Sequence, residues 1–422
     1  MTFRAGLADV DITPPPGTHK IGWIKVIVSD HVLDPLCARA AVFESGGTRL
    51  GIVQLDVLCV PAPLPARIRQ AIAAAHDFPG ENIMVSATHN HAGPAVADRA
   101  VVKRDDAYLE TLLDKIVGVF GEALARAEPA QLGFGRRFEF NTSSNRRVLM
   151  RDGTVKTHGR FSDPDALCFE GPIDPEVAVV GVRADDGRPL GALVNFACHP
   201  THHGPTGALS AGWPGVLARE MTSHGCPITL FLQGAAGNIH TASPATGKDQ
   251  PMEEVGKTLA DHAADALSEM QFTADVTLAC RSRTIDLPLR EPTEEQVRGT
   301  AFGAQRFVDP TIYDQIIPGL IERYRQSPTK PAELQVLELG DALIAAVPAE
   351  YFVEYALRLK QAAWPRPALV VACANGMLGY VPTKEAFEHG GYETTFGPPS
   401  CMAPEAGDLI ADAVTRLIHT KE

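Results

Sequence analysis

The chain has 422 residues, of which 45% are hydrophobic and 21% charged, and its formal net charge is -13 at pH 7. This composition is typical of a soluble globular protein with room for one large domain or two ordinary ones. The acidic balance, with no visible basic patch, argues against a nucleic-acid or anionic-membrane partner. The first residues lack the pattern of a signal peptide, and no later run approaches the length of a membrane span. We therefore expect a cytoplasmic protein.

The eight cysteines are scattered along the chain and form no CxxC pair. Most lie in apolar surroundings, as Cys59 and Cys373 do, so we expect buried, reduced thiols, which fit a reducing compartment. Cys401, in a Pro-Pro-Ser-Cys loop, is the one thiol expected to be open to solvent.

The first third of the chain alternates strand and helix patterns. Asp9 and Asp11 share one face of the first strand, which is typical of surface alternation. Asp56 lies inside an apolar strand, and because burying a lone carboxylate is costly it must be either ion-paired or a support for a nearby site. Apolar runs predict strands over residues 7–12, 37–44, 49–59, 82–87 and 130–138, and helical spacing predicts helices over 64–76 and 107–127.

The rest of the chain continues this pattern. Residues 291–324 carry charged faces and proline breaks, which predict a helical insertion. There is no repeat and no linker, so the simplest interpretation is one α/β domain over 1–422, with a mixed β-sheet core flanked by helices. The predicted strands are 177–183, 190–197, 228–232, 334–339, 342–347 and 368–374, with strand-rich sequence over 274–287, and the predicted helices are one ending at Met221 and those over 252–270, 351–362 and 409–418.

Two of these strands end in histidines. The 82–87 strand is followed by Thr88-His89-Asn90-His91, and the 190–197 strand by Cys198-His199-Pro200. Side chains two apart on an extended segment point to the same side, so His89 and His91 are expected to face the same space. Strand ends with polar residues are where α/β proteins usually place their sites. The plainer alternative is that one histidine caps its strand and the other is solvated.

Two further strand ends carry oxygen donors. Glu350 stands at the junction of a strand and a helix, and Tyr380 follows the last apolar strand. Two imidazoles, a carboxylate and a phenol suit a zinc-type site with an open position for water. Such an ion lowers the pKa of water and polarises a carbonyl, the two needs of amide or ester hydrolysis. No HExxH or paired-cysteine motif offers a rival site.

Three polar features are open to more than one interpretation. Residues 141–147 are expected to form a solvated loop. The small residues of the 233–240 loop allow the backbone to approach an anion, but a tight loop explains them equally well. Four more side chains are candidates for the wall of a pocket: His202, His203, Tyr392 and Glu393.

Taken in order, several motifs resemble the catalytic domain of the neutral (non-lysosomal) ceramidase family, whose members are zinc amidohydrolases. The similar motifs are residues 6–13 (GLADVDIT), 88–94 (THNHAGP), Asn145-Arg146, 195–201 (NFACHPT), the 233–240 loop, Pro348-Ala349-Glu350 and 375–380. The resemblance implies the fold of a ceramidase catalytic domain, with zinc ligation by His89, His199, Glu350 and Tyr380. It also implies that His91 and Arg146 hold the scissile carbonyl or its oxyanion, as an imidazole and a guanidinium can.

The chain departs from the family pattern in one loop. The ceramidases have a Gly-Asp-Val-Ser run whose serine lies in the active site, whereas this chain reads Gly237-Asn238-Ile239-His240. Because the serine is absent, metal-activated water is the expected nucleophile. His240 is then a candidate general base or substrate contact, with loop packing as the alternative. The extra C-terminal β-domain of the ceramidases is also expected to be missing, which favours a small soluble substrate over a sphingolipid.

We therefore predict a zinc-dependent hydrolase that cleaves an amide or ester bond of a small molecule. The predicted Zn2+ ligands are His89, His199, Glu350 and Tyr380, and the predicted catalytic residues are His91, Arg146 and His240. One alternative on the same scaffold is a metal-dependent esterase or a sugar-processing hydrolase. Another is a metal-binding protein without turnover, and the most distant is a cysteine hydrolase acting through Cys401. The pattern leaves the oligomeric state open.

Overall fold

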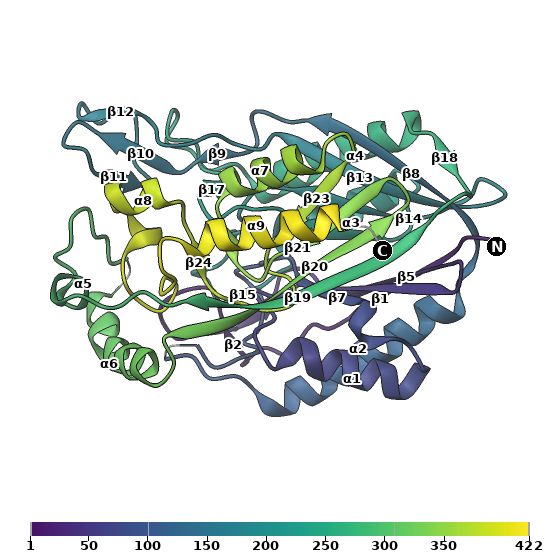
Figure 1. The fold of residues 1–422 in the computed structure, drawn as a ribbon, viewed down its shortest axis with the longest axis horizontal. Helices are drawn as coiled ribbons and strands as arrows, with labels where there is room; N and C mark the ends of the chain where they lie inside the picture. Colours follow the sequence, from purple (N-terminus) through teal and green to yellow (C-terminus); the bar gives the residue numbers. More distant parts are fainter. Residues whose placement is uncertain (1, 100, 308, 421–422) are drawn as a thin grey trace.

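Two β-sheets packed face to face form the framework of the computed structural model, which describes residues 2–99, 101–307 and 309–420 (Figure 1). The larger sheet has the order β16 (Thr229–Gln233), β14 (Pro189–Phe196), β13 (Glu176–Ala184), β8 (Glu128–Phe138), β1 (Arg4–Asp11), β5 (Cys37–Ser45), β6 (Thr48–Leu55) and β7 (Ile83–Ala87), with β18 (Phe272–Thr273) added beside β8. The outermost pairs, β16 with β14 and β6 with β7, are parallel, and the pairs between them are antiparallel. The sheet is therefore mixed, as predicted.

The smaller sheet has the order β19 (Leu278–Pro288), β20 (Thr329–Leu339), β21 (Ala342–Ala346) and β23 (Ala368–Val371). Its last pair is parallel and the other two are antiparallel. Small ladders complete the strands of the described chain: β2 (His19–Lys20) with β3 (Ile27–Val28), β4 (His31–Val32) with β15 (Ala208–Leu209), β9 (Ser144–Asn145) with β17 (Ile239–His240), β10 (Arg147–Met150) with β11 (Val155–Thr157) and β12 (Ala166–Phe169), and β22 (Glu350–Tyr351) with β24 (Tyr380–Val381).

Alternate side chains of the central strands enter two different apolar cores. Phe43 of β5 points into the space between the sheets, where it joins Leu337 of the second sheet. Its neighbour Val42 and Val53 of β6 point to the opposite face, toward the helices. Because both faces of these strands are buried, their sequences are nearly continuous apolar runs instead of alternating ones.

Helices cover the outer faces of both sheets, so the chain has four layers. The nine-stranded sheet is covered by α1 (Leu64–His76), α2 (Asp106–Ala125), α3 (Gly212–Ser223) and α4 (Met252–Glu269), and the four-stranded sheet by α7 (Val353–Ala363) and α9 (Ala406–His419). The remaining helices, α5 (Glu294–Arg298), α6 (Pro310–Gln326) and α8 (Lys384–His389), lie at one end of the molecule, away from the two chain ends (Figure 1). No helix among the described residues is both long and apolar enough to cross a bilayer.

The predicted α/β fold, a mixed sheet flanked by helices, is confirmed, and most elements agree within a few residues. The helix predicted over 64–76 coincides with α1, and Asp105 fixes the start of α2 because its side chain accepts hydrogen bonds from the first backbone N–H groups of that helix. The segment 291–324 contains α5 and most of α6. The solvated loop predicted over 141–147 is wrong over most of its length: Thr142, Ser143 and Asn145 are buried, and Arg146 and Arg147 are buried against acidic partners.

Asp56 is a structural ion pair. Its buried carboxylate accepts hydrogen bonds from Arg39 Nη1 at 2.9 Å, from Gln54 Nε2 at 2.9 Å and from the backbone N–H of Cys37 at 2.8 Å. These partners account for the burial of the carboxylate, so of the two predicted explanations the structure favours ion pairing.

All eight cysteines are free thiols, and the exposed one is Cys168, not Cys401. Cys401 is partly buried, its Sγ donates to the carbonyl oxygen of Gly397 at 3.0 Å, and burial raises the pKa of its thiol. A thiol that stays protonated and bonded to the backbone is a poor nucleophile, so the cysteine-hydrolase alternative finds no support.

Candidate metal centre

The site lies where the ends of the two sheets meet. The N–H of Ala87, the last residue of β7, donates to the carbonyl oxygen of Cys373 just after β23 at 3.2 Å. His89 follows with a φ of 61°, in the left-handed region, so the predicted extended geometry for residues 89–91 is wrong. The predicted outcome nevertheless holds, because the turn brings His89 Nε2 within 3.4 Å of His91 Nε2.

His199 joins these two imidazoles from the end of β14. Its Nε2 lies 3.0 Å from His89 Nε2 and 3.1 Å from His91 Nε2, and all three rings are buried. Three imidazole nitrogens that converge in this way fit a metal site, since each neutral ring can offer a lone pair to one ion. Burial, together with the nearby His89, lowers the pKa of His91 to about 3 and that of His199 well below its ordinary value, which favours these neutral forms.

The backbone determines which nitrogen is free in two of these rings. His89 Nδ1 lies 2.9 Å from the carbonyl oxygen of Leu58, and His199 Nδ1 lies 2.9 Å from that of Ala236. Because a carbonyl only accepts, both Nδ1 atoms carry a proton, so each ring presents its lone pair at Nε2 when it is neutral. Metal-binding histidines are usually held in this way. His91 differs, because its Nδ1 forms no hydrogen bond with the described residues. In the metal-free cluster burial opposes protonation of His89, but Cys373 and Glu350 outweigh it and raise the pKa of His89 to about 10, so His89 would give up its Nε2 proton on binding an ion.

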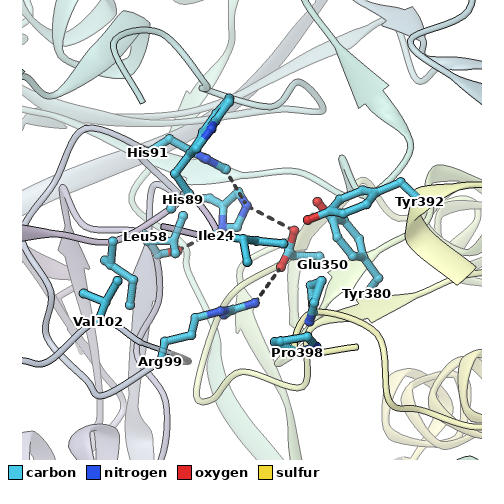
Figure 2. Close-up of a pocket in the computed structure, with 14 residues that line it drawn as sticks. Ile24, Leu58, His89, His91, Arg99, Val102, Glu350, Tyr380, Tyr392 and Pro398 are labelled. Carbon is cyan, nitrogen blue, oxygen red and sulfur yellow. Dashed lines mark hydrogen bonds and ion pairs between the residues drawn. The ribbon is translucent and has the colours of Figure 1, made fainter. Parts of the chain in front are cut away.

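Glu350 adds a carboxylate to the cluster from the side of the smaller sheet. Its Oε2 lies 3.4 Å from His89 Nε2 and 3.9 Å from His199 Nε2, while Arg99 Nη2 lies 3.8 Å from Oε1. Figure 2 shows Arg99 approaching the carboxylate from the side away from the histidines. Burial opposes ionisation, but the positive charges of His89 and Arg99 outweigh it and lower the pKa of Glu350 to about 2.

Tyr380 lies beside Glu350 because β22 and β24 are parallel and these two residues are register partners. The Tyr380 Oη accepts a hydrogen bond from Arg146 Nη2 at 3.1 Å. Burial and the nearby Glu350 raise the pKa of Tyr380 well above its ordinary value. The phenol therefore keeps its proton, and with Arg146 donating to its oxygen the O–H remains available to a further acceptor.

Arg146 is itself fixed by other groups. Its Nε donates to Glu393 Oε1 at 2.7 Å, and its Nη2 also donates to the carbonyl oxygen of Gly237 at 2.7 Å. Glu393 is fully buried and pairs with Arg147 Nη1 through its second oxygen at 2.7 Å. Arg146 thus touches the hydroxyl of Tyr380 and does not line the cavity in front of the histidines.

His240 lies outside the cluster. Its Nδ1 accepts from the backbone N–H of Ala242 at 2.8 Å, so the proton of the neutral ring is on Nε2, which lies 2.7 Å from Thr201 Oγ1. Burial and the neighbouring His158 ring, centred 4.8 Å away, hold the pKa of His240 well below its ordinary value. Both ring nitrogens are therefore occupied, which suits loop packing better than proton transfer.

The cavity in front of the cluster is small, about 50 Å³. A space of this size holds only a few water molecules. Of the four side chains proposed for a pocket wall, Tyr392 lines this cavity, while Glu393 lies behind Arg146. The wall is formed by Ile21, Gly22, Trp23, Ile24, Leu58, His89, His91, Arg99, Val102, Glu350, Tyr380, Tyr392, Pro398 and Pro399 (Figure 2).

Sequence reasoning missed Arg99. It lies in a loop after the histidine motif, where no periodic pattern or turn motif marks it. Only its approach to Glu350, far away in the sequence, reveals its place in the site. No local signal could have identified it.

No protein-family model matches the chain. Neutral ceramidase from Pseudomonas aeruginosa is 24% identical over 444 aligned positions, which cover 86% of this chain and 64% of the relative. Neutral ceramidase B from Dictyostelium discoideum is 23% identical over 188 positions, which cover 42% of this chain and 25% of the relative. The chain therefore spans less than two thirds of the length of these curated relatives.

Two solved structures share the fold of this chain. A ceramidase complexed with C2 superposes with a TM-score of 0.78 at 20% identity, and the neutral ceramidase from Pseudomonas aeruginosa with a TM-score of 0.75 at 21% identity. Each match covers 99% of this chain and 75% of the other. The predicted ceramidase-like fold is thus confirmed, and the sequence and structural matches together support a neutral ceramidase-like family for the chain.

Proposed function

We propose that the chain is a zinc-dependent hydrolase that cleaves an amide or ester bond of a small soluble substrate. The observation that carries the proposal is the convergence of three imidazole Nε2 atoms beside the Glu350 carboxylate. The similarity to neutral ceramidases supports hydrolysis and, of the two bonds, favours the amide. The eight free thiols fit a cytoplasmic location.

The ligands that we assign are His89, His199, Glu350 and Tyr380. His89 and His199 have their Nδ1 protons held by backbone carbonyls, so their Nε2 lone pairs are directed at the cluster. Nitrogen and oxygen donors in this combination suit Zn2+. When bound there, a zinc ion would lower the pKa of a water molecule and polarise a carbonyl.

His91 is assigned to the substrate. It faces the cavity beside the two proposed ligands, and its Nδ1 lacks the backbone partner that they have. A neutral imidazole carries one proton and one lone pair, so His91 can donate to the scissile carbonyl oxygen or accept from water. The third imidazole of the cluster is also within reach of an ion, and the zinc content of His91→Ala separates the two roles.

Arg146 acts through Tyr380 in this proposal. Its guanidinium holds the phenol oxygen, so Tyr380 either binds the ion through that oxygen or keeps its proton and donates it toward the cavity. A preorganised donor stabilises negative charge that develops on the carbonyl oxygen as water adds. Arg146 is accordingly a positioning residue, whereas the sequence resemblance implied a direct contact with the substrate. His240 is assigned to loop packing because both its nitrogens are engaged.

The competing proposal is a metal-binding protein without turnover. It is motivated by the changed loop, in which His240 lies where the ceramidases have their serine. Retained zinc without hydrolysis of any amide or ester would favour it. A metal-dependent esterase or sugar-processing hydrolase on the same scaffold would instead be revealed by the substrate screen.

The test begins with metal content per chain in protein purified without added metal, measured by elemental analysis. We expect about one zinc per chain in the wild type, strongly reduced zinc in His89→Ala and His199→Ala, and retained zinc in His91→Ala. His224→Ala is the matched control, because that histidine pairs with Asp261 on the surface. Amide and ester substrates are then screened with the zinc-loaded protein.

Different results would refute the proposed function and the assignment of His91 to the substrate. A wild type that is free of metal and takes up no zinc would refute the proposed function. Loss of zinc in His91→Ala as complete as in His199→Ala would make His91 a ligand and leave the hydrolase proposal standing.

A further inference from the structure

A second, larger cavity adjoins the metal centre. It has a volume of about 250 Å³, and it shares Ile21, Arg99 and Pro398 with the cavity in front of the histidines. Arg99 therefore stands between the two, with its guanidinium directed at Glu350 on one side. The other walls come from α6, from the start of β20 and from the segment after β23, and they include Leu320, Arg323, Lys330, Met377 and Leu378.

This second cavity is lined by positive charge. Arg99, Arg323 and Lys330 come from three separate parts of the chain and all line it. Its one acidic wall residue, Asp98, is exposed and already engaged, because it accepts from Lys103 Nζ at 3.2 Å and from the backbone N–H of Arg104 at 3.1 Å. Three cations concentrated in one cavity are unexpected in a chain whose net charge is -13.

Two of these cations have no acidic partner among the residues that the structure describes. Within the described ranges neither Arg323 nor Lys330 forms an ion pair, and Lys330 Nζ donates only to the carbonyl oxygen of Met377, at 2.7 Å. Burial lowers the pKa of Lys330 to about 8. A partly dehydrated ammonium without a counter-ion is unfavourable, and a bound anion would relieve that cost.

The apolar part of the cavity defines the rest of the ligand. Ile316 and Leu320 of α6 and Leu378 lie beside the cations, so an apolar side chain and an anion can be held together. Arg99 lines both this cavity and the one in front of the histidines, so it separates the second cavity from the metal centre. A carboxylate held by Arg99 in the second cavity would therefore lie next to the metal centre.

We infer that the substrate is an amide or ester with a free carboxylate near the scissile bond, and that Arg99, Arg323 and Lys330 bind this carboxylate. N-acylated amino acids with an apolar side chain are the class that fits. The inference rests on the proposed function, which it makes more specific. Hydrolysis breaks the C–N bond, forms a bond from the water oxygen to the carbonyl carbon and transfers a proton from water to the leaving nitrogen.

The experiment compares N-acetylmethionine with its neutral analogue N-acetylmethioninamide on the zinc-loaded protein. We expect kcat/KM to favour the carboxylate by about 10- to 100-fold, the range of one or two charge-assisted hydrogen bonds. Arg323→Ala and Lys330→Met should each reduce that preference by about tenfold or more while zinc content is unchanged. Arg325→Ala is the matched control, since Arg325, like Arg323, is an exposed arginine of α6 but does not line the cavity.

Equal or better hydrolysis of the neutral analogue, or a preference that survives in both variants, would overturn the inference and leave the hydrolase proposal intact. If the zinc-loaded protein cleaves neither compound, calorimetric titration with the same pair decides the inference separately. Carboxylate binding that weakens in Arg323→Ala but not in Arg325→Ala supports the anion site. Binding that is absent, or equal for the two compounds, refutes it.

Discussion

The space between the two sheets and the rim at their end are built from the same strands, yet they differ in almost every physical respect. The interior is mainly apolar, with Phe3 and Phe43 stacked at 6.4 Å between ring centroids. The rim holds buried charges, and His89, Cys373 and Asn375 have left-handed backbones with φ of 61°, 53° and 61°. Such conformations cost roughly 1–3 kcal/mol each and persist only where surrounding structure enforces them. The interior therefore stabilises a rim that would not hold its own geometry, and the two should respond differently to substitution.

The largest expected effect belongs to the rim. His199→Ala removes an Nε2 that lies about equally close to two other imidazoles, so zinc binding and hydrolysis should both be lost. We expect kcat/KM to fall on the order of 10³-fold or more, about 4 kcal/mol. The thermal transition of the metal-free variant should stay close to that of the metal-free wild type. A large destabilisation of the metal-free form would contradict the separation of rim and interior.

The converse test is Phe43→Ala in the interior. This side chain is fully buried between the sheets, so its truncation should lower the free energy of unfolding by about 3–5 kcal/mol. Urea denaturation measures this loss, and zinc per folded chain should be unchanged. Phe140→Ala is the control, because Phe140 is 64% exposed and should shift stability by less than about 0.5 kcal/mol.

A fall in pH should weaken the ion pairs of the rim before it affects the apolar interior. Burial opposes ionisation of Glu393, but Arg146 and Arg147 outweigh it and lower the pKa to about 2, below the ordinary 4.5. The unfolded chain binds this proton more readily, so the stabilisation is complete above about pH 4.5 and is lost as the pH falls toward 2. The loss is about 3 kcal/mol. Denaturation of the wild type and of Glu393→Gln at pH 3 to 7 should show a shallower acid slope in the variant. Identical slopes would exclude Glu393 as the cause.

The smallest effect is expected for Tyr380→Phe, which removes one hydroxyl from the rim and leaves the ring. Loss of a donor to the developing oxyanion should lower kcat by about 10- to 100-fold, with a smaller reduction in zinc affinity. Steady-state kinetics at saturating zinc measures the first effect. Tyr108→Phe is the control, because that hydroxyl bonds to the Ile12 carbonyl at the far side of the first sheet. A Tyr380→Phe variant with unchanged kcat would remove the phenol from the mechanism.

Much of the fold could be predicted from the sequence because the signals are local. Apolar runs give the strands, and periodic apolar spacing gave α1 without error at either end. The grouping of His89 with His91 was correct although its geometric reason was not, since a left-handed turn replaces the extended segment. What could not be predicted depends on distant partners. Arg146 looked like part of a solvated loop because Glu393, which buries it, comes far later in the chain. Arg99 and the other cations of the second cavity could not be predicted for the same reason, since they meet only in the folded chain.

The meeting of two sheets at the site also has a kinetic consequence. His89 and His199 follow strands of the nine-stranded sheet, whereas Glu350 and Tyr380 follow β21 and β23 of the other, so the proposed ligands come together only after both sheets have formed and docked. Contacts between segments so distant in sequence are expected to form late in folding. An ion that needs all of them stabilises the native state more than the transition state. Zinc should accordingly slow unfolding while leaving the refolding rate nearly unchanged, because the ion would bind only after the chain has folded.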